Sequence, residues 1–419
     1  MNISVERLDI TEQEKRLLNA IIHVERIRSG YKQIELEHIC SRATLNKIEK
    51  NKCIVNDDLY DELLKFSGTS FDYSHSCFEG DFKLKLDKLY EEMSYYNVDT
   101  TKIIIDQLIM ELIENNGVIE QYYLDILIAV REQFFYDKQP NFEDCEYLLE
   151  LIPYLPEPMK TNARYLMIQS SGYKYLQSAD LIEFTERTNL FDEDYKNNPI
   201  LRSEYLDYLF LTNKLLSAYD FCKDSIRYYR DNGMVNRQCD MYKRLLLITL
   251  NSSSNQMQEV IESVNDFLLK NSNCIAELKK VQVQLQLGII YFKFHNYEAT
   301  YEVLKNIDLV KYKKVLPHKI MMNYSLEKLN RYLEFDYDSQ SLDEYRESQI
   351  DIYNYFKIKH TYLQNGEDID YDLLEQFVLS HKDSFTITIH SVLSNVIVEE
   401  LKEIMQKTKK YWLKRLIQI

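Results

Sequence analysis

The sequence predicts an all-α fold, and three observations support this prediction. The chain of 419 residues contains only eight glycines and six prolines, the residues that sheet-rich folds use at their turns. Hydrophobic residues make up 45% and charged residues 28% of the chain, a composition typical of folded, soluble proteins. From residue 81 onward, apolar segments alternate with polar breaks in the manner of paired helices. The low glycine content also argues against glycine-rich phosphate-binding loops and against sandwich or barrel folds.

The net charge of −16 is unevenly distributed along the chain. Residues 20–52 contain seven basic and four acidic residues, a local charge of +3, so that the remainder sums to −19. An acidic surface repels nucleic acid and anionic lipid. A basic window on an acidic body therefore favours a small nucleic-acid-binding module carried by a larger sensor or scaffold.

The cysteines and the N-terminal residues indicate the compartment. The seven cysteines form no C-x-x-C pair and lie at least 13 residues apart, so neither a disulfide framework nor a zinc knuckle is expected. His38 and Cys40, like His75 and Cys77, have a metal-compatible spacing but stand without further ligands. No signal-peptide core and no long apolar run is present. We expect a cytoplasmic protein without metal or cofactor.

The first domain is expected over residues 1–72 as a compact helical module. Thr11 and Glu14 form a capping-box pattern ahead of a helix that ends at Ser29-Gly30. Further helices are expected over residues 32–38, 42–51 and 57–66. The polar residues 73–80 form the expected linker.

Residues 81–419 are expected to form a repeat domain of helix pairs, each spanning roughly 36–42 residues. A repeat of this length indicates a solenoid, because a single pair cannot bury its own apolar face. The expected helices cover residues 82–96, 99–115, 119–136, 141–152, 157–171, 175–188, 200–212, 214–231, 235–250, 255–270, 276–294, 296–307, 317–334, 341–364, 371–381 and 386–416.

One helix pair has a recognisable repeat motif. Leu287-Gly288-x-x-Tyr291 is followed by Asn296-Tyr297-Glu298-Ala299, and Ala179, Ala218 and Thr300 mark similar points in other second helices. Gly288 is expected to let the second helix approach closely, with Tyr291 filling the space between the helices. This motif resembles the tetratricopeptide repeat, and the resemblance implies a right-handed α-solenoid.

The basic window contains a second motif, which runs from Lys32 to Glu49. Ser41 to Glu49 reads small-basic-small-Thr-apolar-small-basic-Ile-Glu, which resembles the recognition helix of Xre/Cro-type helix-turn-helix regulators. Side chains in the first turn of such a helix reach base edges in the major groove, and neighbouring basic groups contact phosphates. The predicted DNA-contacting residues are Lys32, Gln33, Arg42, Ala43, Thr44, Asn46, Lys47 and Lys50. The alternative interpretation is a helical cap on the solenoid. The interval from Leu36 to Glu49 is about two residues shorter than in the helix-turn-helix pattern, and Glu37 stands where that pattern has a small residue.

The order of helix-turn-helix, linker and degenerate tetratricopeptide repeats resembles the RRNPP group of Gram-positive regulators. The resemblance implies a cytoplasmic homodimer that binds a palindromic operator on double-stranded DNA. It also implies that a short signalling peptide, as used in quorum sensing, binds the repeat domain and switches the regulator.

One face of each first helix in a tetratricopeptide array lines the concave groove. Amide and tyrosine side chains suit such a groove because they can hydrogen-bond an extended peptide while offering contact area. The predicted peptide-binding residues are Thr161, Asn162, Arg164, Ile168, Ser203, Asp207, Phe210, Tyr242, Thr249, Gln282, Gln286, Phe292, Lys293 and Asn323. For each of these residues, packing between helices is the alternative.

No HExxH, GxSxG, GxGxxG or Walker A pattern occurs, so we do not expect an enzyme. The basic stretch from Lys402 to Arg415, which contains Trp412, is expected to cap the solenoid. The alternative to the regulator is a tetratricopeptide scaffold that sequesters a protein partner without binding DNA.

Overall fold

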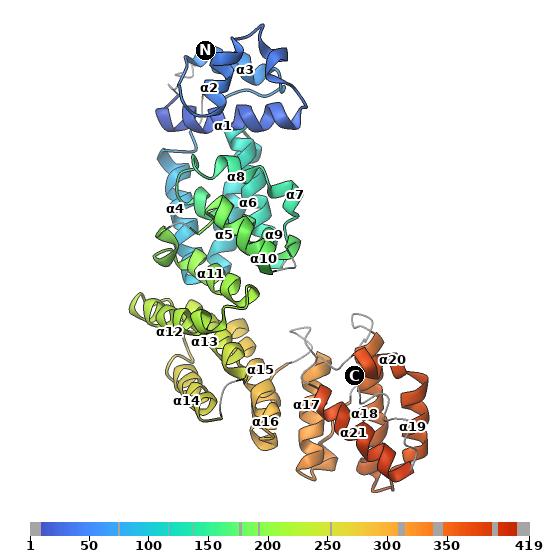
Figure 1. Ribbon diagram of the computed structural model, residues 1–419. Coiled ribbons are helices and arrows are strands. Elements are labelled where there is room, and N and C mark those ends of the chain that lie inside the picture. The colour runs from blue at the N-terminus through green and yellow to red at the C-terminus, as the bar shows by residue number, and fades with distance from the viewer. Residues whose placement is uncertain are drawn as a thin grey trace. The chain divides into compact units, whose positions relative to one another are not determined.

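The computed structural model describes residues 10–73, 76–115, 117–136, 138–175, 178–191, 193–251, 254–308, 315–337, 347–387 and 393–408. All regular elements in these ranges are helices, as predicted. The chain divides into two compact units, residues 1–241 and 242–419 (Figure 1). None of the helices described is long and apolar enough to cross a bilayer.

The first unit begins with three α-helices and a 3-10 turn, η1. Their starts follow the sequence signals: Thr11, Ser41 and Asn56 each accept a backbone N–H bond of the helix that follows. At Thr11 the capping box is complete, because the Glu14 carboxylate accepts the Thr11 N–H at 2.8 Å. The elements are α1 (Glu12–Arg28), η1 (Gln33–Leu36), α2 (Arg42–Glu49) and α3 (Asp57–Lys65).

The rest of the first unit is a series of packed antiparallel helices, in which α4 contacts α5, α5 contacts α6 and α6 contacts α9. Its elements are α4 (Gly80–Tyr95), α5 (Val98–Ile113), α6 (Val118–Tyr136), α7 (Phe142–Cys145), α8 (Leu148–Leu151), α9 (Met159–Lys174), α10 (Ser178–Thr188), η2 (Glu193–Lys196), α11 (Pro199–Leu211) and α12 (Leu215–Asp231). Helix α13 (Val235–Ile248) contains the division between the units.

The second unit contains helices from Tyr242 onward, and a second hydrophobic core joins α15 to α21. Its remaining elements are η3 (Thr249–Asn251), α14 (Ser254–Lys270), α15 (Glu277–Lys293), α16 (Tyr297–Leu304), α17 (Val315–Lys328), η4 (Tyr332–Glu334), α18 (Glu347–Asn365), α19 (Tyr371–Ser380), α20 (Lys382–Ile387) and α21 (Ser394–Thr408).

One hydrophobic core connects the N-terminal module to the helices that follow. It runs without interruption from Ile10 through Leu64 and Phe82 to Ile200. The segment expected as a linker takes part in it, because Cys77 is buried, as is Phe71 just before that segment. The Val118 N–H also donates to the Ser70 carbonyl at 2.8 Å. The module and the helices after residue 80 are therefore packed as one body.

Two local departures from the expected helices have physical causes. The helix expected over residues 141–152 is divided into α7 and α8, because i→i+3 bonds from Leu149 to Glu146 and from Glu150 to Tyr147 interrupt it. The helix expected over residues 317–334 ends at Lys328, followed by Asn330 with φ of 57°. Of the helix expected over residues 386–416, the structure describes the end of α20 and all of α21, while residues 388–392 and 409–416 lie outside the described ranges.

The close helix approach predicted at Gly288 is confirmed. A Cβ atom on Gly288 would lie 2.7 Å from Cδ2 of Leu304, in the next helix α16. The Tyr291 hydroxyl instead accepts a hydrogen bond from Asn265 of the preceding helix α14, at 3.1 Å. The small residue is thus required by the α15–α16 contact, while Tyr291 bonds to the helix before it.

Candidate functional site: the exposed face of α2 and a pocket in the first unit

Helix α2 is anchored by two apolar side chains and presents its polar face to solvent. Leu45 and Ile48, three residues apart, are fully buried. The Ser41 hydroxyl caps the helix by accepting the Thr44 N–H at 3.2 Å. The opposite face carries Arg42, Ala43, Lys47 and Lys50, all of them exposed. Among the residues described, none of its three basic side chains is in an ion pair.

The last residue of α2 fixes that helix to α1. The Glu49 carboxylate accepts hydrogen bonds from Arg26 (2.9 Å to Nη2), from Gln33 Nε2 at 2.7 Å and contacts His23 Nδ1 at 3.2 Å. Burial alone would raise the pKa of Glu49, but the bonds from His23, Arg26 and Gln33 outweigh it and lower the pKa to about 2. Glu49 is therefore a charged, internally compensated group at neutral pH.

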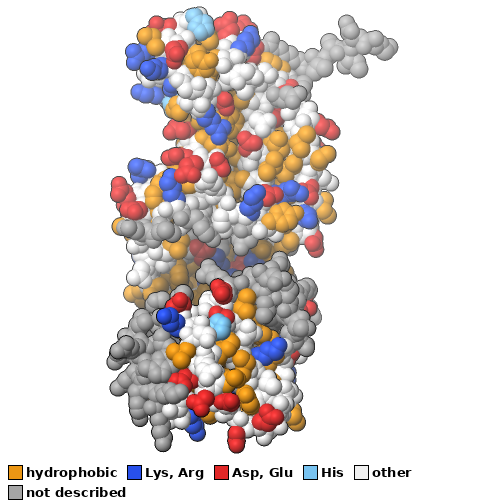
Figure 2. Space-filling view, turned by 90° about the vertical axis from the view of Figure 1, so that its right-hand side faces the viewer, with side chains coloured by type: hydrophobic (Ala, Val, Ile, Leu, Met, Phe, Trp, Pro, Cys, Tyr) orange, Lys and Arg blue, Asp and Glu red, His pale blue; other side chains and the backbone are white. Residues whose placement is uncertain are grey.

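The exposed charged side chains of residues 20–52 are mostly basic. Glu49 is bonded to Arg26, and the Glu25 carboxylate accepts the Tyr122 hydroxyl at 2.5 Å. Two of the four acidic residues in the basic window are thereby used inside the protein. Figure 2 shows Lys and Arg side chains gathered on the N-terminal module, with acidic ones among them. Within residues 20–52 the exposed basic residues are Arg28, Lys32, Arg42, Lys47, Lys50 and Lys52.

The remaining predicted DNA-contacting residues have other local roles. The Gln33 amide donates a hydrogen bond to Glu49 within the module. The Thr44 hydroxyl lies 2.9 Å from that of Ser41, next to the helix cap. Lys32 is exposed and directly precedes η1, while Asn46 is half-buried on α2. The helix expected over residues 32–38 is only this one 3-10 turn, which Glu35 closes by accepting the Lys32 N–H.

The end of α1 is clamped onto the helices that follow. The Arg28 guanidinium lies 4.2 Å from the centre of the Tyr147 ring, a cation–π contact. Tyr122 of α6 donates to Glu25 of α1, and Ser76 donates to Glu14 at 3.0 Å. Both ends of α1 are therefore bonded to segments that follow the module in the chain.

A pocket of about 450 Å³ lies between α9, α10 and α11 in the first unit. Its volume is within the range of small-ligand sites. It brings together three of the predicted peptide-binding residues, Ile168, Asp207 and Phe210. Its other lining residues are Gln169, Ser171, Gly172, Leu181, Thr185, Leu190, Phe191, Glu204, Tyr208 and Leu211.

The other predicted peptide residues of the first unit do not line this pocket. Asn162, Arg164 and Ser203 are buried at 2%, 6% and 2% exposure. Thr161 is fully buried, donates to Glu157 at 2.8 Å and accepts from Asn198. The peptide-site prediction used only first-helix positions, so it did not include the pocket residues on α10 or in the connection between α10 and α11. Glu204 could have been found, since it lies one turn before Asp207 on α11.

The predicted peptide residues of the second unit are mostly packed or bonded within it. Thr249 and Asn323 are fully buried, and the Asn323 amide both accepts the Asp336 N–H and donates to its carbonyl. Phe292 is a core residue, and Tyr242 packs on Phe267. The remaining three are Gln282, which contacts Lys243 at 3.4 Å, the buried Gln286, and Lys293, which is exposed and donates to the Leu250 carbonyl.

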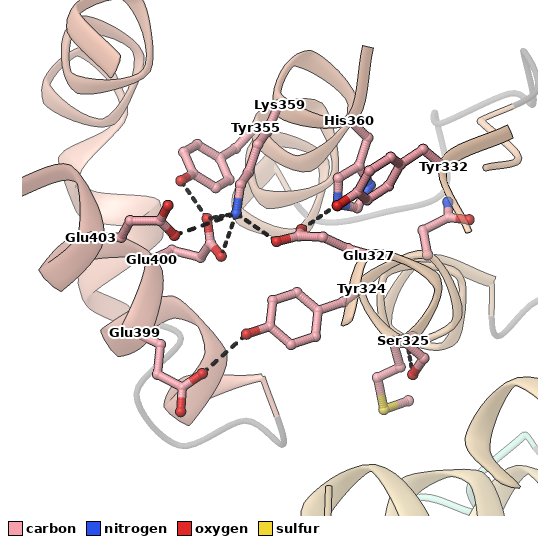
Figure 3. A network of polar contacts seen from close by, with 12 residues as sticks. Tyr324, Ser325, Glu327, Tyr332, Tyr355, Lys359, His360, Glu399, Glu400 and Glu403 are labelled. Carbon is pink, nitrogen blue, oxygen red and sulfur yellow. Dashed lines mark hydrogen bonds and ion pairs between the residues drawn. The ribbon is translucent and has the colours of Figure 1, made fainter. Parts of the chain in front are cut away.

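Figure 3 shows a buried ion network in the second unit that the sequence did not reveal. Lys359 of α18, only 1% exposed, bonds to Glu400 of α21 at 2.7 Å and to Glu327 of α17 at 3.0 Å. Burial lowers the pKa of Lys359, but the carboxylates of Glu400 and Glu327 outweigh it and raise the pKa. His360 contacts Glu327 at 2.8 Å, and burial lowers the pKa of its imidazole. This network ties three helices together.

Three predicted features fall wholly or partly outside the described residues. They are His75, residues 341–346 of the helix expected over 341–364, and residues 409–419, which hold Trp412 and four of the six basic residues of the C-terminal stretch. Within the described ranges, no group of three or more His, Cys, Asp or Glu side chains is placed to hold a metal ion.

The exposed face of α2 can bind an anionic surface, and the pocket can receive a small ligand or side chain. In comparisons with known proteins, no family model, no curated protein and no solved structure matches the chain.

Proposed function

We propose that this chain is a cytoplasmic transcriptional regulator. It binds a palindromic operator on duplex DNA as a homodimer, through α2, and is switched by a short signalling peptide bound by the helix pairs that follow. The observation that supports this proposal best is the exposed face of α2. Arg42, Lys47 and Lys50 project from a helix whose inner face is fixed by Leu45 and Ile48, as major-groove recognition requires.

The coupling between the module and the helices behind it supports the switching part of the proposal. Arg28 stacks on Tyr147, and Glu25 accepts a bond from Tyr122. A ligand that repositions these helices would move α2 with them. It can change DNA affinity only to the extent that it binds one arrangement better than the other.

The test is selection of DNA from a random duplex pool by the full chain at near-physiological salt. We expect an enriched palindromic site whose affinity falls steeply with added salt, because phosphate contacts release counterions. Arg42→Glu and Lys47→Glu should each abolish binding. Lys102→Glu, which makes the same charge change on the exposed side of α5, should leave most of the affinity intact. Equal losses of DNA affinity in Lys47→Glu and Lys102→Glu would show that α2 is not the DNA-binding surface.

A scaffold that captures a protein partner is the second candidate function. The net charge of −19 outside residues 20–52 favours it, and so does the continuous core between the module and the following helices, as expected of a cap. If the folded chain enriches no DNA, with or without peptides present, the scaffold becomes the favoured function.

A further inference from the structure

Helix α12 packs against α11 and leaves its opposite face in solvent (Figure 1). Its buried residues are Ala218, Cys222, Ser225 and Tyr229. They recur every three or four positions and therefore lie on one side of the helix. The other side of α12 is open to a partner.

Three basic side chains lie in one line on this exposed face. Lys223, Arg227 and Arg230 are four and three residues apart, and all three are exposed. The Lys223 ammonium lies 4.6 Å from the centre of the Tyr219 ring, and Arg230 Nε donates to Asp231 at 2.9 Å. Within the ranges that the structure describes, Arg227 has neither a hydrogen-bond partner nor an ion-pair partner. Its guanidinium is therefore available to an anionic group.

The acidic side chains of α12 lie on a neighbouring line. Asp220, Asp224 and Asp231 are four and seven residues apart. Asp224 is paired with the buried Arg202 of α11, and Asp231 with Arg230. The three cations of the basic line therefore face two carboxylates, those of Asp220 and Asp231. This surface keeps a surplus of positive charge on a chain whose net charge is −16.

Large apolar side chains are exposed at the first turn of the same helix. Leu215 and Leu216 are 42% and 78% exposed, and Tyr219 is half-buried one turn later. Leu216 comes seven residues before Lys223, which corresponds to about 10 Å along the helix. Exposed apolar side chains gathered in this way indicate a surface that a partner covers. The exposed face of α12 is thus apolar at its start and basic toward its end.

This order of features favours a protein segment over a lipid surface or a nucleic acid. A helix that lies on a membrane turns an apolar side toward the lipid along its whole length, but the apolar side of α12 is buried against α11. A nucleic-acid site is strongly cationic, whereas Asp220 and Asp231 border this line of cations. A protein segment with separate apolar and acidic side chains can match both parts of the face.

We propose that the exposed face of α12 binds an acidic segment of a partner protein. The segment places a large apolar side chain against Leu215 and Leu216, and carboxylates against Lys223 and Arg227. Arg227 is the central contact, because a guanidinium can bind a carboxylate through two parallel N–H bonds. An extended segment advances about 3.3 Å per residue, so its carboxylates should lie roughly three to six residues from the apolar side chain. The interaction goes beyond the proposed DNA binding and does not depend on it.

The test measures the binding of three short peptides to the full chain by saturation-transfer NMR at low salt. The acidic probe is acetyl-Leu-Leu-Ala-Glu-Glu-Ala-Glu-amide. In the neutral probe Gln replaces each Glu, and in the serine probe Ser replaces each Leu. We expect the acidic probe to bind at least about fivefold more tightly than the neutral probe, and to lose this advantage as salt is added. The serine probe should bind more weakly than the acidic probe, because it lacks the apolar contact. Equal affinity for the acidic and neutral probes would overturn the proposal.

Two pairs of variants test whether the probes bind to α12. Arg227→Glu should abolish the preference for the acidic probe, whereas Lys102→Glu, the same charge change on α5, should retain it. Leu216→Ser should weaken both probes that contain leucine, whereas Leu84→Ser, at a leucine of α4 that is 68% exposed, should not. All four positions are exposed, so the circular dichroism spectrum should be retained. Equal losses in Arg227→Glu and Lys102→Glu would show that the acidic probe binds elsewhere.

Two further measurements distinguish a protein partner from other anionic surfaces. Sedimentation with phosphatidylserine–phosphatidylcholine vesicles tests lipid binding, and a DNA duplex of random sequence tests binding of nucleic acid. We expect Arg227→Glu to leave both unchanged. If it loses vesicle or duplex binding to the same extent as probe binding, α12 attracts any anion and the proposal fails. If the probes bind as expected but no DNA site is enriched, this surface stands and the regulator proposal fails.

Discussion

Arg26 of α1 and Glu49 of α2 are bound to each other across the N-terminal module, with Nη2 of the arginine 2.9 Å from Oε2 of the glutamate. The Glu49 side chain is 4% exposed and that of Arg26 12% exposed. His23 and Gln33 contact the same carboxylate. Glu49 thereby sets the orientation of α2 against α1, and so of the exposed face that we propose contacts DNA.

Replacing Glu49 by Gln should weaken the module. The substitution leaves the Arg26 guanidinium without its counter-charge in a mostly buried position, and we expect a loss of about 1–3 kcal/mol. Hydrogen exchange of the α2 amides measures the local free energy of opening. Glu37→Gln, which alters an exposed carboxylate of the same module, should change it by less than about 0.5 kcal/mol. Similar effects for the two variants would show that the Arg26–Glu49 pair adds nothing to stability.

The same pair predicts acid sensitivity. In the folded chain the pKa of Glu49 is lowered to about 2, below its ordinary value of 4.5. A lowered pKa means that the fold favours the charged carboxylate, so its contribution is complete above pH 4.5 and is lost as the pH falls toward 2. We expect α2 to lose up to about 3 kcal/mol of protection in this window. The Glu49→Gln variant, measured in parallel, should lack this component of the pH dependence.

The sequence predicted the helices of the module well because their signals are local. Thr11, Ser41 and Asn56 are capping residues, and Leu45 with Ile48 marks the buried side of α2. The prediction of a helix over residues 32–38 was wrong in length, because only the 3-10 turn η1 forms there. The shared core behind the module was also missed, because it depends on contacts such as that of Arg28 with Tyr147, more than a hundred residues away.

The pocket was predicted only in part. Ile168, Asp207 and Phe210 were found because they lie on first helices, whose positions follow from the repeat pattern. Leu181 lies on α10 and Leu190 in the connection after it, so a prediction based on one face of the first helices could not include them. The two-unit division also separates the predicted peptide residues into two groups, which a pattern of sequence positions could not anticipate.

Lys359 should be a major determinant of the stability of the second unit. Replacing it by Met would leave Glu327 and Glu400 buried near one another without a cation, and we expect a loss of about 3–5 kcal/mol. The matched control is Lys357→Met, because Lys357 lies on the same helix α18 but is exposed. Urea denaturation followed by circular dichroism should show the second unit of Lys359→Met unfolding earlier, while Lys357→Met behaves as the unchanged chain. An unchanged midpoint for Lys359→Met would mean that the two glutamates take up protons at little cost.

Two helical glycines should respond in opposite ways to the same substitution. At Gly172 an added Cβ makes only an ordinary contact with Leu211, so Gly172→Ala should gain about 0.5–1 kcal/mol from the better helix propensity of alanine. At Gly288 the added Cβ would lie 2.7 Å from Leu304 Cδ2 and 3.0 Å from its Cγ, which forces α15 and α16 apart. There the strain should exceed the gain in propensity, and we expect a net loss of about 1–3 kcal/mol. The melting temperatures of Gly172→Ala and Gly288→Ala measure both changes. Stabilisation by Gly288→Ala would show that Leu304 can move aside and that the α15–α16 contact does not require a glycine.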